Sequence, residues 1–185
     1  MKTELTQEIT LEFCNYLKNS KVYIGTYKEI EKYINKDCEY TLYNFTREKE
    51  PAPKICKNIE KESYNIYIHN SQNIWNKNQK KRRTDIFLEI PNFCKCNFEI
   101  KITKSDLINS KYGKNLNNQF NFIICTPDIY YYVNQLLTTD KYKDVGIIVR
   151  ESKNKFKILS FPLERSYDEH FNNYKIKDNY LWFES

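Results

Sequence analysis

The chain has 185 residues, which is enough for one domain with a hydrophobic core, and 40% of them are apolar. Its formal net charge of +6 suits a polyanionic partner such as a nucleic acid, although an ordinary solvated surface would give the same balance. No apolar run approaches the ~20 residues of a membrane-spanning helix, and the opening MKTELTQEIT has no apolar signal core. We therefore expect a cytoplasmic protein with no membrane partner.

The first third of the chain predicts two helices. Apolar residues recur every four positions over 3–19, which is close to the helical period. Thr26, followed three residues later by Glu29, forms a capping-box pattern that begins a second helix over 26–36.

The following segments predict strands separated by polar connections. Alternating side chains favour strands over 38–46 and 63–70, whereas the charged, proline-containing stretch 47–62 is expected to be a loop. The later elements are expected in this order: strands 84–90 and 96–103, helix 104–115, strand 119–126, helix 127–137, a hairpin of 145–151 and 155–162, and a tail over 164–185 of helix plus extended chain.

The strand CNFEIKIT over 96–103 separates two kinds of side chain. Because side chains alternate along a strand, Phe98 and Ile100 share one face while Glu99 and Lys101 share the other. If this strand forms a hairpin with 84–90, through a turn around Asn92, then Asp85 approaches Glu99 and Lys101. Two carboxylates and one ammonium would then meet at one edge of a sheet.

This trio has a chemical use in phosphodiester hydrolysis. Two carboxylates, the backbone carbonyl of Ile100 and water can hold a hard divalent cation, typically Mg²⁺. Such a cation activates bound water and neutralises charge on a scissile phosphate, and a lysine can stabilise the transition state. The competing interpretation is an exposed sheet face, on which Glu and Lys two residues apart are common.

The stretch RRTDIFLEIPNFCKCNFEIKITKSDL resembles the core of the PD-(D/E)xK nuclease superfamily, in which an Asp, a hairpin and a Glu-x-Lys strand follow one another. The segments that follow this stretch are also similar to those of a small branch of bacterial repair and phage nucleases, so that the resemblance covers about 83–162. It implies an α/β fold with a restriction-endonuclease-like core, whose mixed central β-sheet is flanked by helices. The chain would be a single domain over 1–185, with the core motif region at 83–162 and a family-specific insertion at 37–82.

The resemblance implies roles for individual residues. Asp85, Glu99 and Lys101 would be catalytic, and the ligands of Mg²⁺ or Mn²⁺ would be Asp85, Glu99, the Ile100 carbonyl and an acidic residue of the first helix. Glu8 is the choice for that acidic residue, with Glu12 second. The residues expected to contact DNA are Lys81, Arg82, Arg83, Lys104, Lys111, Lys114 and Gln119.

Other features leave alternatives open. Cys94 and Cys96 form a Cys-x-Cys pair, but without a second pair we expect reduced thiols instead of a metal site. The tyrosines at 130–132 are able to stack on bases, although packing of their helix is favoured.

The expected activity is that of a Mg²⁺-dependent endonuclease acting on DNA. A sequence-specific type II restriction endonuclease, a non-catalytic nucleic-acid-binding module on the same fold, and an unrelated α/β protein with a chance motif are the alternatives. A homodimer stays open by analogy with nucleases that cut both strands.

Overall fold

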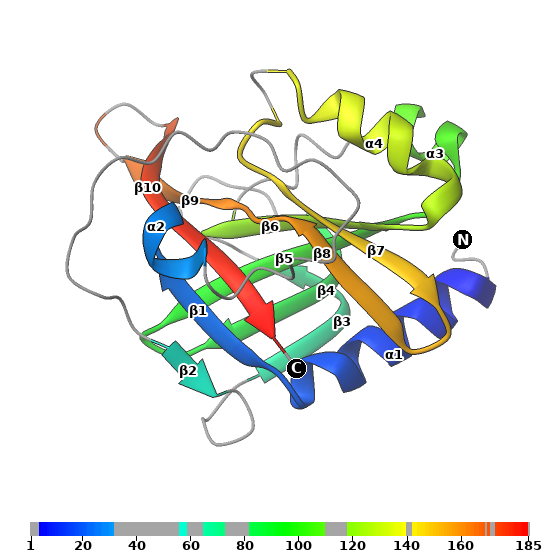
Figure 1. The fold of residues 1–185 in the computed structure, drawn as a ribbon, viewed down its shortest axis with the longest axis horizontal. Helices are drawn as coiled ribbons and strands as arrows, with labels where there is room; N and C mark the ends of the chain where they lie inside the picture. Colours follow the sequence, from blue (N-terminus) through cyan, green and yellow to red (C-terminus); the bar gives the residue numbers. More distant parts are fainter. Residues whose placement is uncertain are drawn as a thin grey trace.

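Two β-sheets and two groups of helices form the layers of the structure (Figure 1). The computed structural model describes residues 4–31, 56–58, 65–72, 82–109, 118–139, 142–168, 170 and 173–184. Its helices are α1 (Glu4–Lys18), α2 (Tyr27–Ile30), α3 (Lys104–Asn109), the 3₁₀ turn η4 (Pro127–Ile129) and α4 (Tyr130–Leu136). Its strands are β1 (Lys21–Gly25), β2 (Cys56–Asn58), β3 (Asn65–Gln72), β4 (Arg82–Ile90), β5 (Cys94–Lys101), β6 (Phe120–Cys125), β7 (Gly146–Ser152), β8 (Lys155–Ser160), β9 (Leu163–Asp168) and β10 (Asn173–Glu184).

The larger sheet is mixed and has six strands in the order β3-β4-β5-β6-β7-β8. Its first two pairs, β3 with β4 and β4 with β5, are antiparallel, whereas β5, β6 and β7 run parallel. A final antiparallel pair joins β7 to β8. The expected mixed central sheet of an α/β fold is therefore confirmed.

One face of this sheet packs on α1 and on a second sheet. Phe98 of β5 has its ring centroid 4.9 Å from that of Phe13 on α1, and 6.0 Å from that of Phe183 on β10. It also stacks on Phe122 of the neighbouring strand β6, with centroids 5.1 Å apart. This aromatic cluster joins the helix, the six-stranded sheet and the second sheet into one core.

The opposite face of the sheet is covered by α3 and α4. Ile123 and Cys125 of β6 pack with Leu107 of α3 and Val133 of α4 in a separate apolar cluster. Helices thus lie on both sides of the sheet, as expected. None of the helices in the described ranges is long and apolar enough to span a membrane.

The second sheet was not predicted. It is antiparallel, with the order β2-β1-β10-β9, and lies on the α1 side of the molecule (Figure 1). Its strand β2 lies within the stretch 47–62 that was expected to be a loop. The expectation of a helix in the tail over 164–185 was wrong, since β9 and β10 occupy the described part of that region.

Local sequence signals placed the other described elements correctly. The backbone N–H of Thr26 donates to Glu29 Oε1 at 2.9 Å, which forms one half of the predicted capping box. Pro127 begins the turn that leads into α4. The strand expected over 38–46 and the later parts of the helices expected over 26–36 and 104–115 lie outside the described residues.

Candidate active site

The hairpin of β4 and β5 carries the three residues of the predicted trio. A turn over 91–93 joins the strands, and Asn92 at its centre has φ 63°, the left-handed conformation that asparagine tolerates better than most residues. The register pairs Ile86 with Phe98 and Ile90 with Cys94. The predicted hairpin is therefore confirmed.

Asp85 occupies the place where the ladder between the two strands stops. The last paired residues are Ile86 and Phe98, although β5 continues to Lys101. Beyond that point the backbone N–H of Ile100 donates to Asp85 Oδ2 at 2.8 Å. The Asp85 carboxylate thus takes the hydrogen bond that a backbone carbonyl of β4 would otherwise accept, and it is held against the β5 backbone beside Glu99.

All three ionisable side chains of the trio are buried. Asp85 is 4% exposed, Glu99 5% and Lys101 8%. They share the sheet face that α3 and α4 cover, because Glu99 pairs in register with Ile123 and Lys101 with Cys125. This burial differs from the exposed sheet face that was the competing interpretation. Burying charged groups is costly, so such a cluster is a candidate functional site.

Lys101 is oriented by the helix that follows it. Its Nζ lies 3.8 Å from Oδ1 of Asp106, in the first turn of α3. Thr103 Oγ1 accepts the backbone N–H of Asp106 at 3.0 Å and so fixes that turn. Sequence reasoning missed Asp106 as part of the site, although an acidic residue in the first turn of a helix directly after the Glu-x-Lys strand was a usable signal.

Buried amides continue this polar face toward the start of the strands. Asn97 and Asn121 are fully buried and lie opposite each other in the parallel pairing of β5 with β6. Asn121 Nδ2 donates to the backbone carbonyl of Asn118 at 3.1 Å. A strip of polar side chains therefore runs from Asn121 and Asn97 to Glu99 and Lys101.

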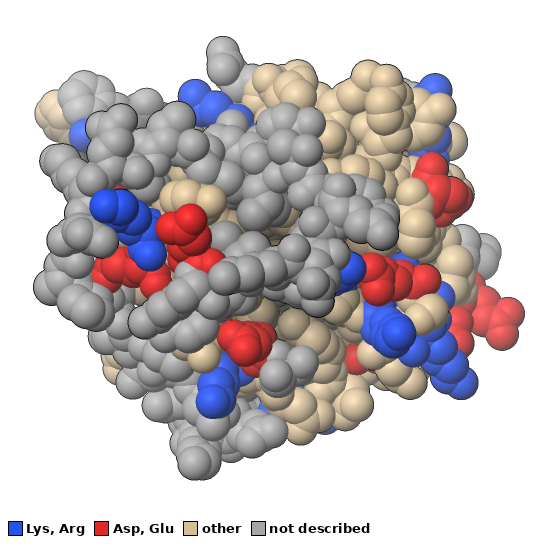
Figure 2. Space-filling view, in the orientation of Figure 1, with Lys and Arg blue, Asp and Glu red and all other residues tan. Residues whose placement is uncertain are grey.

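The first helix does not add a carboxylate to this group. Glu8, the expected fourth ligand, has its Oε2 3.8 Å from an Arg150 guanidinium nitrogen at the end of β7. Glu12 accepts two hydrogen bonds from Arg150, at 2.9 and 3.2 Å, and one from the backbone N–H of Asn154 at 2.7 Å. Figure 2 shows the acidic and basic side chains gathered over this end of α1 and the β7–β8 hairpin. Glu8 and Glu12 therefore tie α1 to that hairpin.

Gln119 also has a structural place instead of the expected one. Its Oε1 accepts the backbone N–H of Lys95 at 3.1 Å, and its Nε2 donates to Glu164 at 3.2 Å. It precedes β6, whose first residue pairs with Cys96, so it lies at the opposite end of β5 from Lys101. Gln119 joins three strands and is too far along the sheet to contact a phosphate at the trio.

The predicted basic contacts are described in part. Lys104 begins α3 and is exposed, with its Nζ 4.2 Å from the centroid of the Tyr132 ring. Arg82 and Arg83 belong to β4, but their side chains lie outside the described structure, as do all atoms of Lys81, Lys111 and Lys114.

Cys94 and Cys96 are buried free thiols with their sulfur atoms 3.9 Å apart. Burial, together with the neighbouring Cys94, raises the pKa of the Cys96 thiol well above its ordinary value. In the structure both side chains pack in the core as small apolar residues.

The carboxylate oxygens of Asp85 and Glu99 are of the chemical type that a hard divalent cation prefers. Asp85 and Glu99 supply two buried carboxylates, and the carbonyl of Ile100 lies between the side chains of Glu99 and Lys101 along β5. Among the described residues, no three or more His, Cys, Asp or Glu side chains converge as a metal-binding group. Any cation here would be held by two side chains, the backbone and water.

No family model matches the chain, and no curated protein matches it. Among solved structures, a protein of unknown function from Silicibacter pomeroyi is similar at 12% identity with a TM-score of 0.40. The similarity covers 58% of this chain and 65% of that protein, so the chain spans less than two thirds of its length. These comparisons assign no family and no activity.

Proposed function

We propose that the protein is a metal-dependent endonuclease that hydrolyses DNA phosphodiester bonds, built on the restriction-endonuclease-like core of the PD-(D/E)xK superfamily. One observation carries the proposal. The Asp85 carboxylate accepts the Ile100 N–H at 2.8 Å, at the point on β5 where Glu99 and Lys101 are buried. Burying three ionisable side chains costs desolvation free energy and so lowers the stability of the fold. A catalytic role would explain why the protein has them there.

The order of elements around the trio supports the same proposal. The resemblance implies an Asp strand, a hairpin, a Glu-x-Lys strand, a helix, a strand that ends before a proline, a further strand and a final hairpin strand. The chain has β4, β5, α3, β6, α4 and then β7 with β8 in that order. β6 is buried along its whole length, in keeping with a central strand covered on both faces.

The residues divide into ligands and a charge-stabilising group. Asp85, Glu99 and the Ile100 carbonyl would hold Mg²⁺ or Mn²⁺, which when bound would neutralise charge on the scissile phosphate and activate water. Lys101 supplies an ammonium at the end of β5 that stabilises negative charge developing on the phosphate. Asp106 acts through Lys101 as a positioning residue, because it faces the ammonium at 3.8 Å.

DNA is the expected partner, and the formal charge of +6 favours association with its phosphates. A homodimer would let one active site act on each strand, in analogy with nucleases that cut both strands. Discrete fragments from plasmid DNA would favour a restriction endonuclease over a structure-specific or nonspecific enzyme.

The test compares the wild-type protein with Glu99→Ala and Lys101→Ala on supercoiled plasmid, linear duplex and single-stranded DNA. Each substrate is incubated with Mg²⁺, with Mn²⁺ and with EDTA. We expect metal-dependent cleavage that both substitutions abolish while DNA binding is retained. Glu89→Ala is the matched control, because Glu89 is a glutamate of the same hairpin that lies on β4 and forms an ion pair with Lys95 at 3.8 Å, at the far end of the hairpin from the trio.

A second readout does not depend on activity. Mn²⁺ should raise the melting temperature of the wild-type protein and of Glu89→Ala, but not of Glu99→Ala, because a ligand stabilises only the state that binds it. Full cleavage activity in Lys101→Ala would refute the assignment of this trio as the nuclease active site. Binding of DNA without cleavage of any substrate would support the non-catalytic module instead.

A further inference from the structure

Two exposed tyrosines lie on the helix that packs beside the candidate active site. Tyr131 is 64% exposed and Tyr132 37%, and these are consecutive residues of α4. Leu11 and Ile176, the other large apolar side chains that the described residues expose this strongly, lie on different elements. Tyr130, by contrast, packs against the apolar cluster between α4 and the sheet. The tyrosine pair is therefore a surface feature that core packing does not explain.

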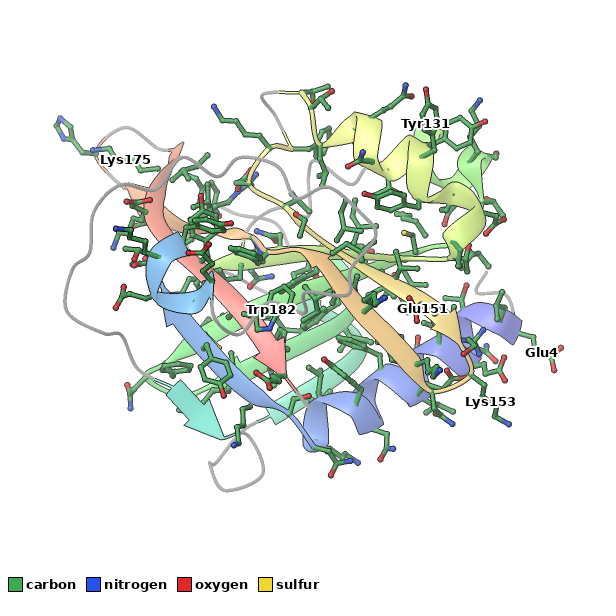
Figure 3. The ribbon with its side chains drawn as sticks, in the orientation of Figure 1. Glu4, Tyr131, Glu151, Lys153, Lys175 and Trp182 are labelled. Carbon is green, nitrogen blue, oxygen red and sulfur yellow. The ribbon has the colours of Figure 1, made fainter. Side chains whose placement is uncertain are left out.

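The two rings are held in a defined arrangement. Their centroids are 5.7 Å apart and their planes meet at 78°, so the pair is edge-to-face. Gln135, one turn further along α4, donates from Nε2 to the Tyr131 hydroxyl at 3.0 Å. Figure 3 shows Tyr131 on the outer side of α4, next to α3. Rings fixed in this way lose little conformational freedom when a flat ligand binds.

A lysine adds positive charge to this surface. Lys104 Nζ lies 4.2 Å from the centroid of the Tyr132 ring, within the range of a cation–π interaction. Lys104 is the first residue of α3 and follows Lys101 by three residues, so their Cα atoms are at most about 11 Å apart. The ion pair between Lys101 and Asp106 connects the same helix to the candidate active site.

Aromatic rings next to a cation suit single-stranded nucleic acid. Bases stack on such rings irrespective of sequence, and the ammonium attracts the adjoining phosphate. A paired base inside a duplex already has both faces covered by its neighbours, so only an unpaired base can offer a face to a tyrosine.

We propose that Tyr131 and Tyr132 form a stacking site for an unpaired nucleobase of the DNA strand that is cut, with Lys104 beside a neighbouring phosphate. Because Lys104 follows Lys101 by only three residues, the stacked base would lie close to the scissile bond. The inference rests on the proposed nuclease function and names its substrate class: DNA that is single-stranded or frayed close to the cut.

The test measures binding in EDTA, where cleavage does not interfere. A short single-stranded oligonucleotide containing one 2-aminopurine and a blunt duplex of the same sequence are titrated with each protein. Tyr131→Ala should bind the single strand about tenfold more weakly and lose quenching of 2-aminopurine, because one stacked base contributes this much affinity. Its affinity for the duplex should not change. Tyr131→Phe should keep single-strand binding, and Leu11→Ala is the control for loss of an exposed apolar side chain elsewhere.

The outcomes separate this inference from the proposed function. Unchanged single-strand binding by Tyr131→Ala, or an equal loss on single strand and duplex, would overturn the stacking site. If the wild-type protein nevertheless cuts DNA in a Glu99-dependent way, the nuclease proposal stands without it. If the protein cuts no DNA but binds single strands through Tyr131, the stacking site stands and the nuclease proposal fails.

Discussion

Replacing Glu12 with alanine should destabilise the protein more than replacing Glu8, although both carboxylates face the same guanidinium. The Glu12 carboxylate accepts three hydrogen bonds, two from Arg150 and one from the Asn154 backbone. Its side chain is 7% exposed and that of Arg150 is 14% exposed. Loss of Glu12 would therefore leave a largely buried guanidinium without its main partner.

The expected cost of Glu12→Ala is about 2–4 kcal/mol, somewhat below that of breaking a fully buried ion pair, because Glu8 still faces Arg150. For a domain of this size the melting temperature should fall by roughly 2–4 °C per kcal/mol, which calorimetry measures directly. Glu8→Ala should cost less than about 1 kcal/mol, since the Glu8 side chain is 47% exposed and its Oε2 lies 3.8 Å from the guanidinium.

A double substitution sharpens this test. Glu12→Ala combined with Arg150→Met should recover much of the lost stability, because the uncompensated buried charge is removed with its partner. Equal losses for Glu8→Ala and Glu12→Ala, or strictly additive losses in the double variant, would refute the conclusion that a buried pair ties α1 to the β7–β8 hairpin.

Two further predictions concern acid sensitivity and packing. Burial raises the pKa of the Glu12 carboxyl, but its hydrogen bonds and the guanidinium charge outweigh this and lower the pKa below the ordinary 4.5. Because this pKa is lower in the folded state than in the unfolded chain, the ionised carboxylate stabilises the fold above pH 4.5, and this stabilisation is lost as pH falls through the folded-state pKa. The difference in unfolding free energy between wild type and Glu12→Gln, measured by urea unfolding, should therefore become smaller in acid. Gly146→Ala should cost about 1–3 kcal/mol in the same assay. Its new Cβ would lie 2.7 Å from Pro162 and 2.8 Å from Phe122. Gly25→Ala, whose Cβ would be no nearer than 3.0 Å to any atom, should cost less, and equal costs would contradict this reading of the packing.

Local alternation was enough to predict the centre of the site. The faces of β5 follow directly from its sequence, and Asn92 indicated the turn that brings Asp85 back to Glu99 and Lys101. These signals act over fewer than twenty residues. For the same reason the hairpin of β7 with β8 and the buried strand β6 were predicted correctly.

Features that depend on distant partners could not be predicted. Residues 180–183 of β10 are all buried. They therefore lack the alternation of apolar and polar side chains that identifies a strand with one solvent-exposed face. The role of Gln119 depends on Lys95 and Glu164, which are far away in sequence. The sequence places Glu8 on a charged helix, but nothing near it in the sequence indicates that its partner is Arg150.

The pairing of β1 with β10 has a consequence for how the chain folds. Their register places Lys21 beside Glu184, so strands from opposite ends of the described chain lie side by side in the second sheet. β2 and β9 join that sheet only through these two strands. The loop-closure entropy of nearly the whole chain must be overcome before these contacts form, which gives the fold a high contact order. We therefore expect the hairpin that carries Asp85 and Glu99 to assemble early, and the second sheet to close over its apolar face as a late and slow step.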